Sequence, residues 1–138
     1  MCEAPNYVPP YTDLIGKPFK LGGRGPEEFD CYGLIAELAK RSGDTFPDYA
    51  SPAVLEEIAG CIDAMMPHWT PCKRGKGAIV TFRLNHVIND KHLSLVSHVG
   101  MVLPDDRVIH SWKRSGGVIT EPLSVWEHRI NGFYRFAQ

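Results

Sequence analysis

Several features that would assign the chain to a common functional class are missing from its sequence. No apolar run approaches the roughly 18 residues of a membrane-spanning helix, and the N-terminal segment has neither the basic start nor the apolar core of a signal peptide. No basic run is longer than Lys73-Arg74, and the formal net charge is -1. We therefore expect no membrane span, no nucleic-acid partner, and synthesis in the cytoplasm without a signal peptide.

The cysteines lack the paired spacing of a structural zinc site. Cys2, Cys31, Cys61 and Cys72 form no C-x-x-C pair, and a chain of 138 residues can build a core without disulfides. We expect four free thiols. The glycine-rich segment after Leu21 is not followed by Gly-Lys-Ser or Gly-Lys-Thr, which excludes a phosphate-binding loop. No cofactor is expected.

The patterns that are present place helices before strands. Residues 1–10 contain three prolines and predict an extended lead-in, and residues 11–138 fit a single domain. Helical patterns run from Tyr11 to Ile15 as a short turn, from Cys31 to about Arg41, and from Ser51 to a stop at Pro67. Strand-like runs follow at residues 78–82, 95–103, 107–112, 118–121 and 132–136. Helices first and antiparallel strands second indicate an α+β fold.

Cys31 stands where a glycine-rich loop gives way to the helix that ends near Arg41. Asp30, directly before it, is of the residue type that caps helix N-termini. The first turn of a helix carries unpaired N–H groups and the positive end of the helix dipole, which favour a thiolate. The position therefore predicts a nucleophilic cysteine rather than an inert one.

Two histidines are predicted to share one face of a hairpin. The runs at 95–103 and 107–112 are separated by Pro104, Asp105 and Asp106. If these three residues form the loop, Leu103 pairs with Arg107, the numbers of paired residues sum to 210, and even-numbered residues share a face. His98 and His110 then project together, and Gly100 leaves open space in front of them. A four-residue loop would place them on opposite faces.

A thiol at a helix start and two histidines on one sheet face are the parts of a cysteine hydrolase. Cys31 would attack a carbonyl carbon, and His98 would pair with the thiolate and later protonate the leaving amine. His110 would orient the His98 ring, and the Cys31 backbone N–H would stabilise the oxyanion. Zinc bound by Cys31, His98 and His110 remains an alternative, although no fourth protein ligand is evident.

Four short blocks in this order give the chain a family resemblance. The blocks are GKPFKLGG at 16–23, FDCYGL at 29–34, SHVG at 97–100 and VIHS at 108–111. Together they resemble the NlpC/P60 family of cell-wall cysteine peptidases. The resemblance implies a papain-like fold, with N-terminal helices packed on a C-terminal antiparallel sheet. It also implies cleavage of peptidoglycan stem peptides between D-glutamate and a diamino acid, with Cys31 as nucleophile, His98 as base and His110 as the third residue.

The loop around Gly22 and the small size also resemble the family variant that is encoded with phage tail proteins. This resemblance implies tail proteins as partners, and a location in a virion tail or a prophage product that acts at the cell wall. Three residues are expected to contact the substrate. Arg24 would meet a carboxylate of an acidic stem peptide, Tyr32 would narrow the cleft, and Trp112 lies two residues after His110 on the same face.

The sequence departs from the family pattern in three places: Phe19, Tyr32 in place of the small serine that commonly follows the cysteine, and Lys76-Gly77-Ala78 where a Gly-Asp pair usually precedes the central strand. Phe19 stands where the family often has a tyrosine whose hydroxyl is a second oxyanion donor, and Tyr11 is the candidate replacement. Loss of one such donor costs on the order of 2.7 to 4 kcal/mol of transition-state stabilisation. The alternative function is therefore a catalytically weak or inactive module of the same fold, one that binds cell wall or is a structural part of a tail.

Overall fold

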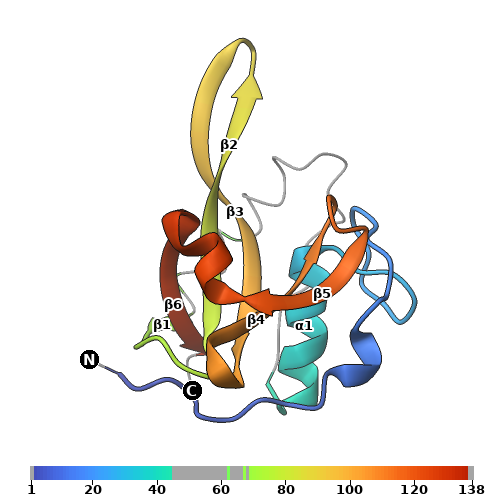
Figure 1. The fold of residues 1–138 in the computed structure, drawn as a ribbon, viewed down its shortest axis with the longest axis vertical. Coiled ribbons are helices and arrows are strands. Elements are labelled where there is room, and N and C mark those ends of the chain that lie inside the picture. Colours follow the sequence, from blue (N-terminus) through green and yellow to red (C-terminus); the bar gives the residue numbers. More distant parts are fainter. Residues whose placement is uncertain (1, 45–61, 63–66, 68, 137–138) are drawn as a thin grey trace.

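The computed structural model describes residues 2–44, 62, 67 and 69–136. A six-stranded antiparallel sheet, in the order β1-β6-β2-β3-β4-β5, forms its centre. Helix α1 (Cys31–Arg41) covers part of one face of this sheet (Figure 1). The strands are β1 (Trp69–Pro71), β2 (Ile79–Ile88), β3 (Lys91–Leu103), β4 (Arg107–Trp112), β5 (Gly117–Pro122) and β6 (Ile130–Phe136). The predicted α+β fold is confirmed, and no helix in the described ranges is long and apolar enough to cross a membrane.

Helix α1 begins and ends where the sequence predicts. Asp30 caps its N-terminus by accepting a hydrogen bond from the Gly33 N–H at 2.7 Å. Leu34, Ile35 and Leu38 recur at helical spacing and are completely buried against the sheet. At the other end, Arg41 pairs with Asp13 and so holds the short 3-10 turn η1 (Thr12–Leu14) against the C-terminal end of α1.

The sheet separates two hydrophobic clusters because successive side chains of a strand point to opposite faces. On one face Ile79, Met101 and Ile109 pack against α1. On the other face Val80, Phe82, Val102 and Val108 pack against the 3-10 segment η4 (Leu123–Arg129) through Leu123 and Trp126. Helix α1 thus lies on one face of the sheet and η4 lies on the other.

The hairpin of β2 and β3 is much longer than expected, and it projects from the rest of the molecule (Figure 1). Ile88 pairs with Lys91 across Asn89 and Asp90, whose φ angles of 51° and 62° form a tight two-residue turn. The prediction ended the first strand at Phe82 and started the next at Leu95. It was wrong there because residues 83–88 are only half-buried at every second position and residues 89–94 are all exposed, so this part of the hairpin lacks a buried apolar face.

The hairpin of β3 and β4 has the predicted register. Met101 pairs with Ile109, Val102 with Val108, and Leu103 with Arg107, so each pair of numbers sums to 210 and the loop is the three residues of η3 (Pro104–Asp106). Gly100 does not leave open space, however. A Cβ atom at Gly100 would lie 2.8 Å from Val108 Cγ2, 2.9 Å from the Ile109 carbonyl oxygen and 3.2 Å from His110 Cβ. Gly100 therefore permits close approach of β4.

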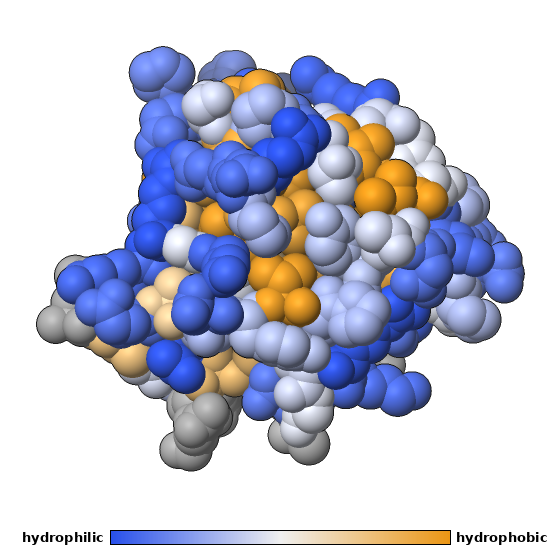
Figure 2. Space-filling view, turned by 60° about the horizontal axis from the view of Figure 1, so that its bottom comes forward, coloured by the Kyte–Doolittle hydropathy of each residue, from blue (hydrophilic) through white to orange (hydrophobic). Residues whose placement is uncertain are grey.

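One further strand was not predicted, and one predicted helix lies mostly outside the described residues. Strand β1 was not predicted, because three residues ending in a proline carry too short a pattern. The predicted helix from Ser51 to Pro67 falls, apart from Ile62 and Pro67, outside the described residues. Figure 2, which brings the lower end of the Figure 1 view forward, shows hydrophobic atoms in the middle of that face with hydrophilic atoms around them.

Candidate active site

Cys31 is the first residue of α1, and a buried carboxylate holds the loop before it in place. Asp30 Oδ2 accepts a hydrogen bond from the Gly22 N–H at 2.9 Å, and Arg24 Nη1 lies 2.9 Å from both carboxylate oxygens. The same side chain caps the helix through Gly33. One carboxylate therefore connects the glycine-rich loop to the turn that carries the thiol.

Close packing around this turn explains why residue 33 is glycine and residue 111 is serine. Gly33 faces the Gly23 carbonyl so closely that a Cβ atom would collide with it, so the loop can lie on α1 only if residue 33 is glycine. From the other side, Ser111 Oγ donates a hydrogen bond to the Phe29 carbonyl at 2.6 Å. This buried bond joins the end of β4, one residue after His110, to the segment that precedes Cys31.

His98 and His110 meet as predicted, and a third side chain extends them into a chain. His98 Nε2 lies 2.7 Å from His110 Nδ1, and His110 Nε2 lies 2.8 Å from Glu121 Oε2 on β5. The two imidazoles are 2% and 0% exposed, respectively, so neither bond competes with bulk water. The structure thus contains a buried row of His98, His110 and Glu121.

This row determines the tautomers of both rings. A carboxylate accepts hydrogen bonds and does not donate them, so His110 Nε2 carries the proton that is shared with Glu121. In the neutral ring His110 Nδ1 is then an acceptor, and His98 Nε2 must donate to it. The remaining nitrogen, His98 Nδ1, is left with a lone pair. His98 is therefore prepared to accept a proton at Nδ1.

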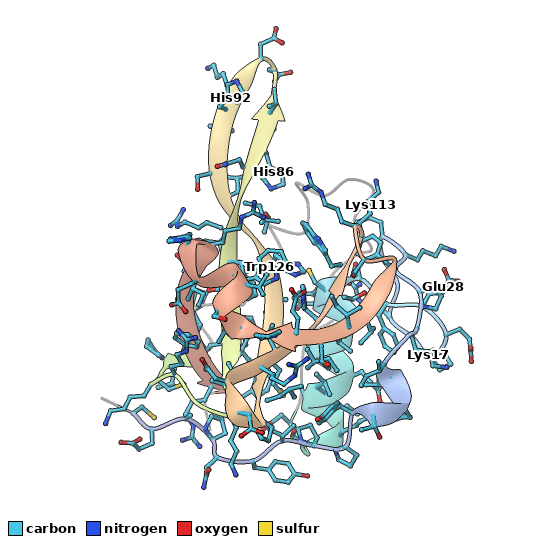
Figure 3. All side chains as sticks on the ribbon, viewed as in Figure 1. Lys17, Glu28, His86, His92, Lys113 and Trp126 are labelled. Carbon is cyan, nitrogen blue, oxygen red and sulfur yellow. The ribbon has the colours of Figure 1, made fainter. Side chains whose placement is uncertain are left out.

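Aromatic rings enclose His98. Trp126 of η4 stacks on it with ring centroids 5.3 Å apart, Phe82 lies at 5.5 Å and Trp112 at 4.9 Å. Figure 3 shows Trp126 in the centre of the molecule, between η4 and the sheet. Burial lowers the pKa of His98 well below its ordinary value, and the nearby His110 lowers it further. Burial also lowers the pKa of His110, with Glu121 opposing that shift.

The Cys31 thiol is buried as well, and its pKa moves in the opposite direction to the one expected. Loss of hydration raises the pKa, and the negative charge of Asp30 raises it further, against smaller opposing effects of the backbone at Val99 and Tyr32. Burial thus opposes the thiolate that the helix start is expected to favour. Burial therefore favours the neutral forms of both the thiol and the imidazole.

Cys31 contacts strand β3 at the residue that follows His98 and has no direct bond to His98 itself. The Val99 backbone, one residue beyond His98, acts on the thiol. Helix α1 packs on both β3 and β4. Among the hydrogen bonds of the described residues, none joins Cys31 to either histidine. The structure therefore brings the two histidines together directly, and the thiol to the adjoining backbone.

The two candidate oxyanion residues lie in different places. Phe19 pairs with Phe29, two residues before the thiol, so it is near the helix start but has no hydroxyl group. Tyr11 lies beside η1, whose Asp13 pairs with Arg41 at the far end of α1. At 1.5 Å per residue that end is roughly 15 Å from Cys31. Tyr11 is therefore not positioned to replace the missing hydroxyl.

Two of the three predicted substrate contacts are engaged inside the protein. Arg24 is bonded to Asp30, and its guanidinium carbon lies 5.1 Å from the centre of the Tyr32 ring. Tyr32 is 1% exposed and packs in the core, so it supports the wall behind the thiol and does not narrow a cleft. Trp112 is half-buried and touches His98. A substrate contact by Trp112 remains a prediction.

The arrangement also bears on the zinc alternative. Both ring nitrogens of His110 are occupied, one by His98 and one by Glu121. Binding of a metal ion to His110 would break one of these buried bonds. Within the described part of the chain, no three His, Cys, Asp or Glu side chains gather as a metal site. The donor set therefore fits proton transfer better than metal coordination.

Glu121 and Trp126 were missed by sequence reasoning, although a signal for Glu121 was present. Val108 pairs with Glu121 across β4 and β5, so Glu121 shares a face with Val108 and with His110, two residues further along. The pairing rule that places His98 beside His110 also places Glu121 on the face of His110 once β4 and β5 pair as a hairpin. Trp126 carries no such signal, because a 3-10 segment after β5 has no fixed periodicity relative to the sheet.

Comparison with known proteins agrees with this architecture. The structure superposes on NlpC1 from Trichomonas vaginalis with a TM-score of 0.67 and 23% identity, over 90% of this chain and 40% of that one. An NlpC/P60 family protein from Bacillus cereus gives a TM-score of 0.66 and 21% identity, over 96% of this chain and 42% of that one. The chain thus spans about two-fifths of the length of these proteins.

A shorter relative matches over most of its own length. The NlpC/p60 domain of the peptidoglycan hydrolase SagA gives a TM-score of 0.53 and 16% identity, over 90% of this chain and 89% of that one. A comparison with curated protein sequences finds no match. At these identities the structural likeness shows the fold, and the sequence model of the NlpC/P60 family matches residues 16–135. The chain belongs to the NlpC/P60 family.

Proposed function

We propose that this chain is a cysteine endopeptidase that hydrolyses peptide stems of peptidoglycan through a thioester on Cys31. Membership of the NlpC/P60 family supports the reaction class. A structural relative that is described as a peptidoglycan hydrolase supports the substrate class. The observation that carries the proposal is the buried row from His98 through His110 to Glu121, because it leaves His98 with one nitrogen ready to accept a proton.

The reaction starts from the neutral pair. As the Cys31 sulfur bonds to the carbonyl carbon of the substrate, the thiol proton passes to His98 Nδ1, and the carbonyl oxygen becomes an oxyanion. The Cys31 backbone N–H, in the first turn of α1, is positioned as a donor for that oxyanion. Proton transfer that accompanies attack removes the need for a resting thiolate, which burial disfavours.

The second half of the reaction returns the proton. The imidazolium of His98 donates from Nδ1 to the leaving nitrogen, the C–N bond breaks, and the acyl group remains on sulfur as a thioester. Water then attacks the thioester while His98 accepts its proton, and the thiol is restored. While His98 is charged, His110 accepts the hydrogen bond from its Nε2 and Glu121 stabilises the charge through His110. His98 is thus base and acid, and His110 orients it.

The bond between D-glutamate and a diamino acid, and a role in a phage tail, remain predictions from the resemblance of the sequence. A catalytically weak or inactive module is the second candidate. Two observations favour it: the Cys31 side chain is 2% exposed, and Phe19 lacks the hydroxyl of the usual tyrosine. In such a module Cys31 would be a core residue, and its replacement would leave binding unchanged.

Digestion of purified muropeptides, with products identified by mass spectrometry, tests the proposal. Wild type should release cut stems, and Cys31→Ala should release none while keeping its melting temperature within a few degrees. Cys72→Ala, a matched change of a buried cysteine outside the site, should cut like wild type. Equal cleavage by wild type and Cys31→Ala would exclude Cys31 as nucleophile, and no cleavage by either, with retained binding to sacculi, would establish the inactive module.

A further inference from the structure

A pocket of about 560 Å³ adjoins the histidine row on the side of the projecting hairpin. It lies between the base of the β2–β3 hairpin, the turn after β4 and the end of η4. Figure 3 shows His86 on the hairpin and Lys113 after β4 on this same upper side of the molecule, above Trp126. The side chains that line it include Arg83, His86, Lys113, Arg114, His128 and Arg129.

The described residues that line this pocket are basic or neutral. Four of them carry fixed positive charges, and none of them is aspartate or glutamate. The chain as a whole has a net charge of -1. The positive charges here are therefore a local concentration and do not follow from a basic composition.

Elsewhere in the described residues, three arginines pair with carboxylates, whereas Arg107 and Arg135 bond to neutral groups. Arg24 pairs with Asp30, Arg41 with Asp13, and Arg74 with Asp106. In contrast, no ion pair within the described ranges joins a carboxylate to any of the four pocket cations. These cations are Arg83, Lys113, Arg114 and Arg129.

Neutral groups hold two of these cations in position. Arg83 Nε donates to Asn131 Oδ1 at 3.1 Å, and the Arg129 guanidinium lies 5.4 Å from the centre of the Trp126 ring. Such contacts orient a guanidinium and leave its charge unneutralised. Arg83 and Arg129 are thus fixed donors with a full positive charge.

The pocket shares a wall with the histidine row. Trp112 lines the pocket and also contacts the His98 ring at a centroid distance of 4.9 Å. Ser97, the residue before His98, lines it too and bonds to His86 at 2.7 Å. A substrate with its scissile bond at His98 would therefore extend directly into the basic pocket.

We propose that this pocket binds a part of the substrate that carries at least two carboxylates, and that Arg83, Arg114 and Arg129 determine this specificity. The identity of this ligand as a substrate rests on the proposed peptidase function. Guanidinium groups bind carboxylates through paired hydrogen bonds, and several unneutralised cations favour a ligand of more than one negative charge. Arg24 was expected to bind a carboxylate of the substrate, but it already pairs with Asp30. The pocket would bind that carboxylate instead.

Binding of citrate to the Cys31→Ala protein tests the pocket without any need for catalysis. Tryptophan fluorescence from Trp112 and Trp126 reports binding at constant ionic strength. We expect Arg114→Gln/Arg129→Gln to weaken citrate binding at least tenfold. The control Lys40→Gln/Lys91→Gln, which removes the same charge from exposed sites outside the pocket, should change it less than twofold. Equal loss in both variants, no binding by the parent protein, or tighter binding of pyrophosphate than citrate would overturn the proposal.

Muropeptide kinetics then separates the pocket from the reaction. The Arg114→Gln/Arg129→Gln enzyme should show a KM at least tenfold higher with kcat within about twofold of wild type, because the pocket lies beside the reacting atoms and does not include them. An unchanged KM would overturn the assignment. If no variant cleaves muropeptides, the peptidase proposal fails, and the citrate measurement still decides whether the pocket binds carboxylates.

Discussion

His110 Nε2 lies 2.8 Å from Glu121 Oε2, so a carboxylate at the back of the site decides which nitrogen of each histidine carries a proton. Glu121 is 21% exposed at its side chain and sits on the neighbouring strand β5. It acts on the reaction through two rings and does not touch the reacting atoms. It is a positioning residue.

Replacement of Glu121 by glutamine should therefore reduce activity with little change in fold. An amide can donate to His110 Nε2, which would reverse the tautomers of both rings and leave His98 Nδ1 protonated. We expect kcat on muropeptides to fall about 100-fold or more, by analogy with the effect of a wrong tautomer in a serine protease. Nitrogen NMR of the imidazoles should show the reversed tautomers, and Glu27→Gln, an exposed carboxylate away from the site, should change neither quantity.

The buried histidines predict a loss of stability in mild acid. The pKa of His98 and that of His110 are lower in the folded chain than the ordinary value of 6.5. Below that pH the unfolded chain binds more protons than the folded one, so the free energy of unfolding decreases as pH falls. The melting temperature should therefore drop between pH 6.5 and pH 5.

The slope of that drop identifies its origin. His98→Asn should flatten the dependence of melting temperature on pH, whatever its effect on absolute stability. His92→Asn, a change at an exposed histidine on the projecting hairpin, should keep the wild-type slope. The same slope in all three proteins would show that the buried histidines do not cause the acid sensitivity.

The thiol of Cys31 should react slowly with an alkylating reagent in the free protein. Burial and the charge of Asp30 raise the pKa of this thiol, and its side chain is 2% exposed. Mass spectrometry after treatment with iodoacetamide at pH 7 should find Cys31 modified more slowly than Cys2, which is half-buried near the N-terminus. Faster modification of Cys31 than of Cys2 would show that the free protein holds an accessible thiolate.

A methyl group at Gly100 should disturb the histidine pair through the backbone. The added Cβ atom would lie within 3.0 Å of Val108 Cγ2 and the Ile109 carbonyl oxygen, so β4 must move away from β3. We expect Gly100→Ala to lower the free energy of unfolding by about 1 to 3 kcal/mol. Urea unfolding measures this loss. An unchanged urea midpoint would show that β4 can move away from β3 without a loss of stability.

Structure that depends on residues close in the sequence could be predicted, and contacts between distant segments could not. The bounds of α1 and the three-residue loop between β3 and β4 follow from local rules, namely a cap, an apolar repeat and a turn, and these predictions are confirmed. The pairing of His98 with His110 followed from register alone. Local rules could not reveal that Trp126 would cover His98, because that contact depends on how η4 folds back over the sheet.

The charge state of the Cys31 thiol could not be predicted from local rules for the same reason. A cysteine at a helix start has a lowered pKa only if water or a positive charge reaches it, and the sequence does not state how deeply α1 is buried. Arg24 was likewise assigned to the substrate because its partner, Asp30, was known only as a helix cap. Both features depend on burial, a property of the assembled chain and not of its segments.

The contacts of Asp30 have a consequence for how the chain folds. Its carboxylate bonds to Gly22 in the loop, to Arg24, and to Gly33 in the helix. Neither the loop nor the first turn of α1 can retain its bonds to this side chain once the other has unfolded. The two segments therefore open and close as one cooperative unit, and the thiol becomes ordered only at the moment when both have formed.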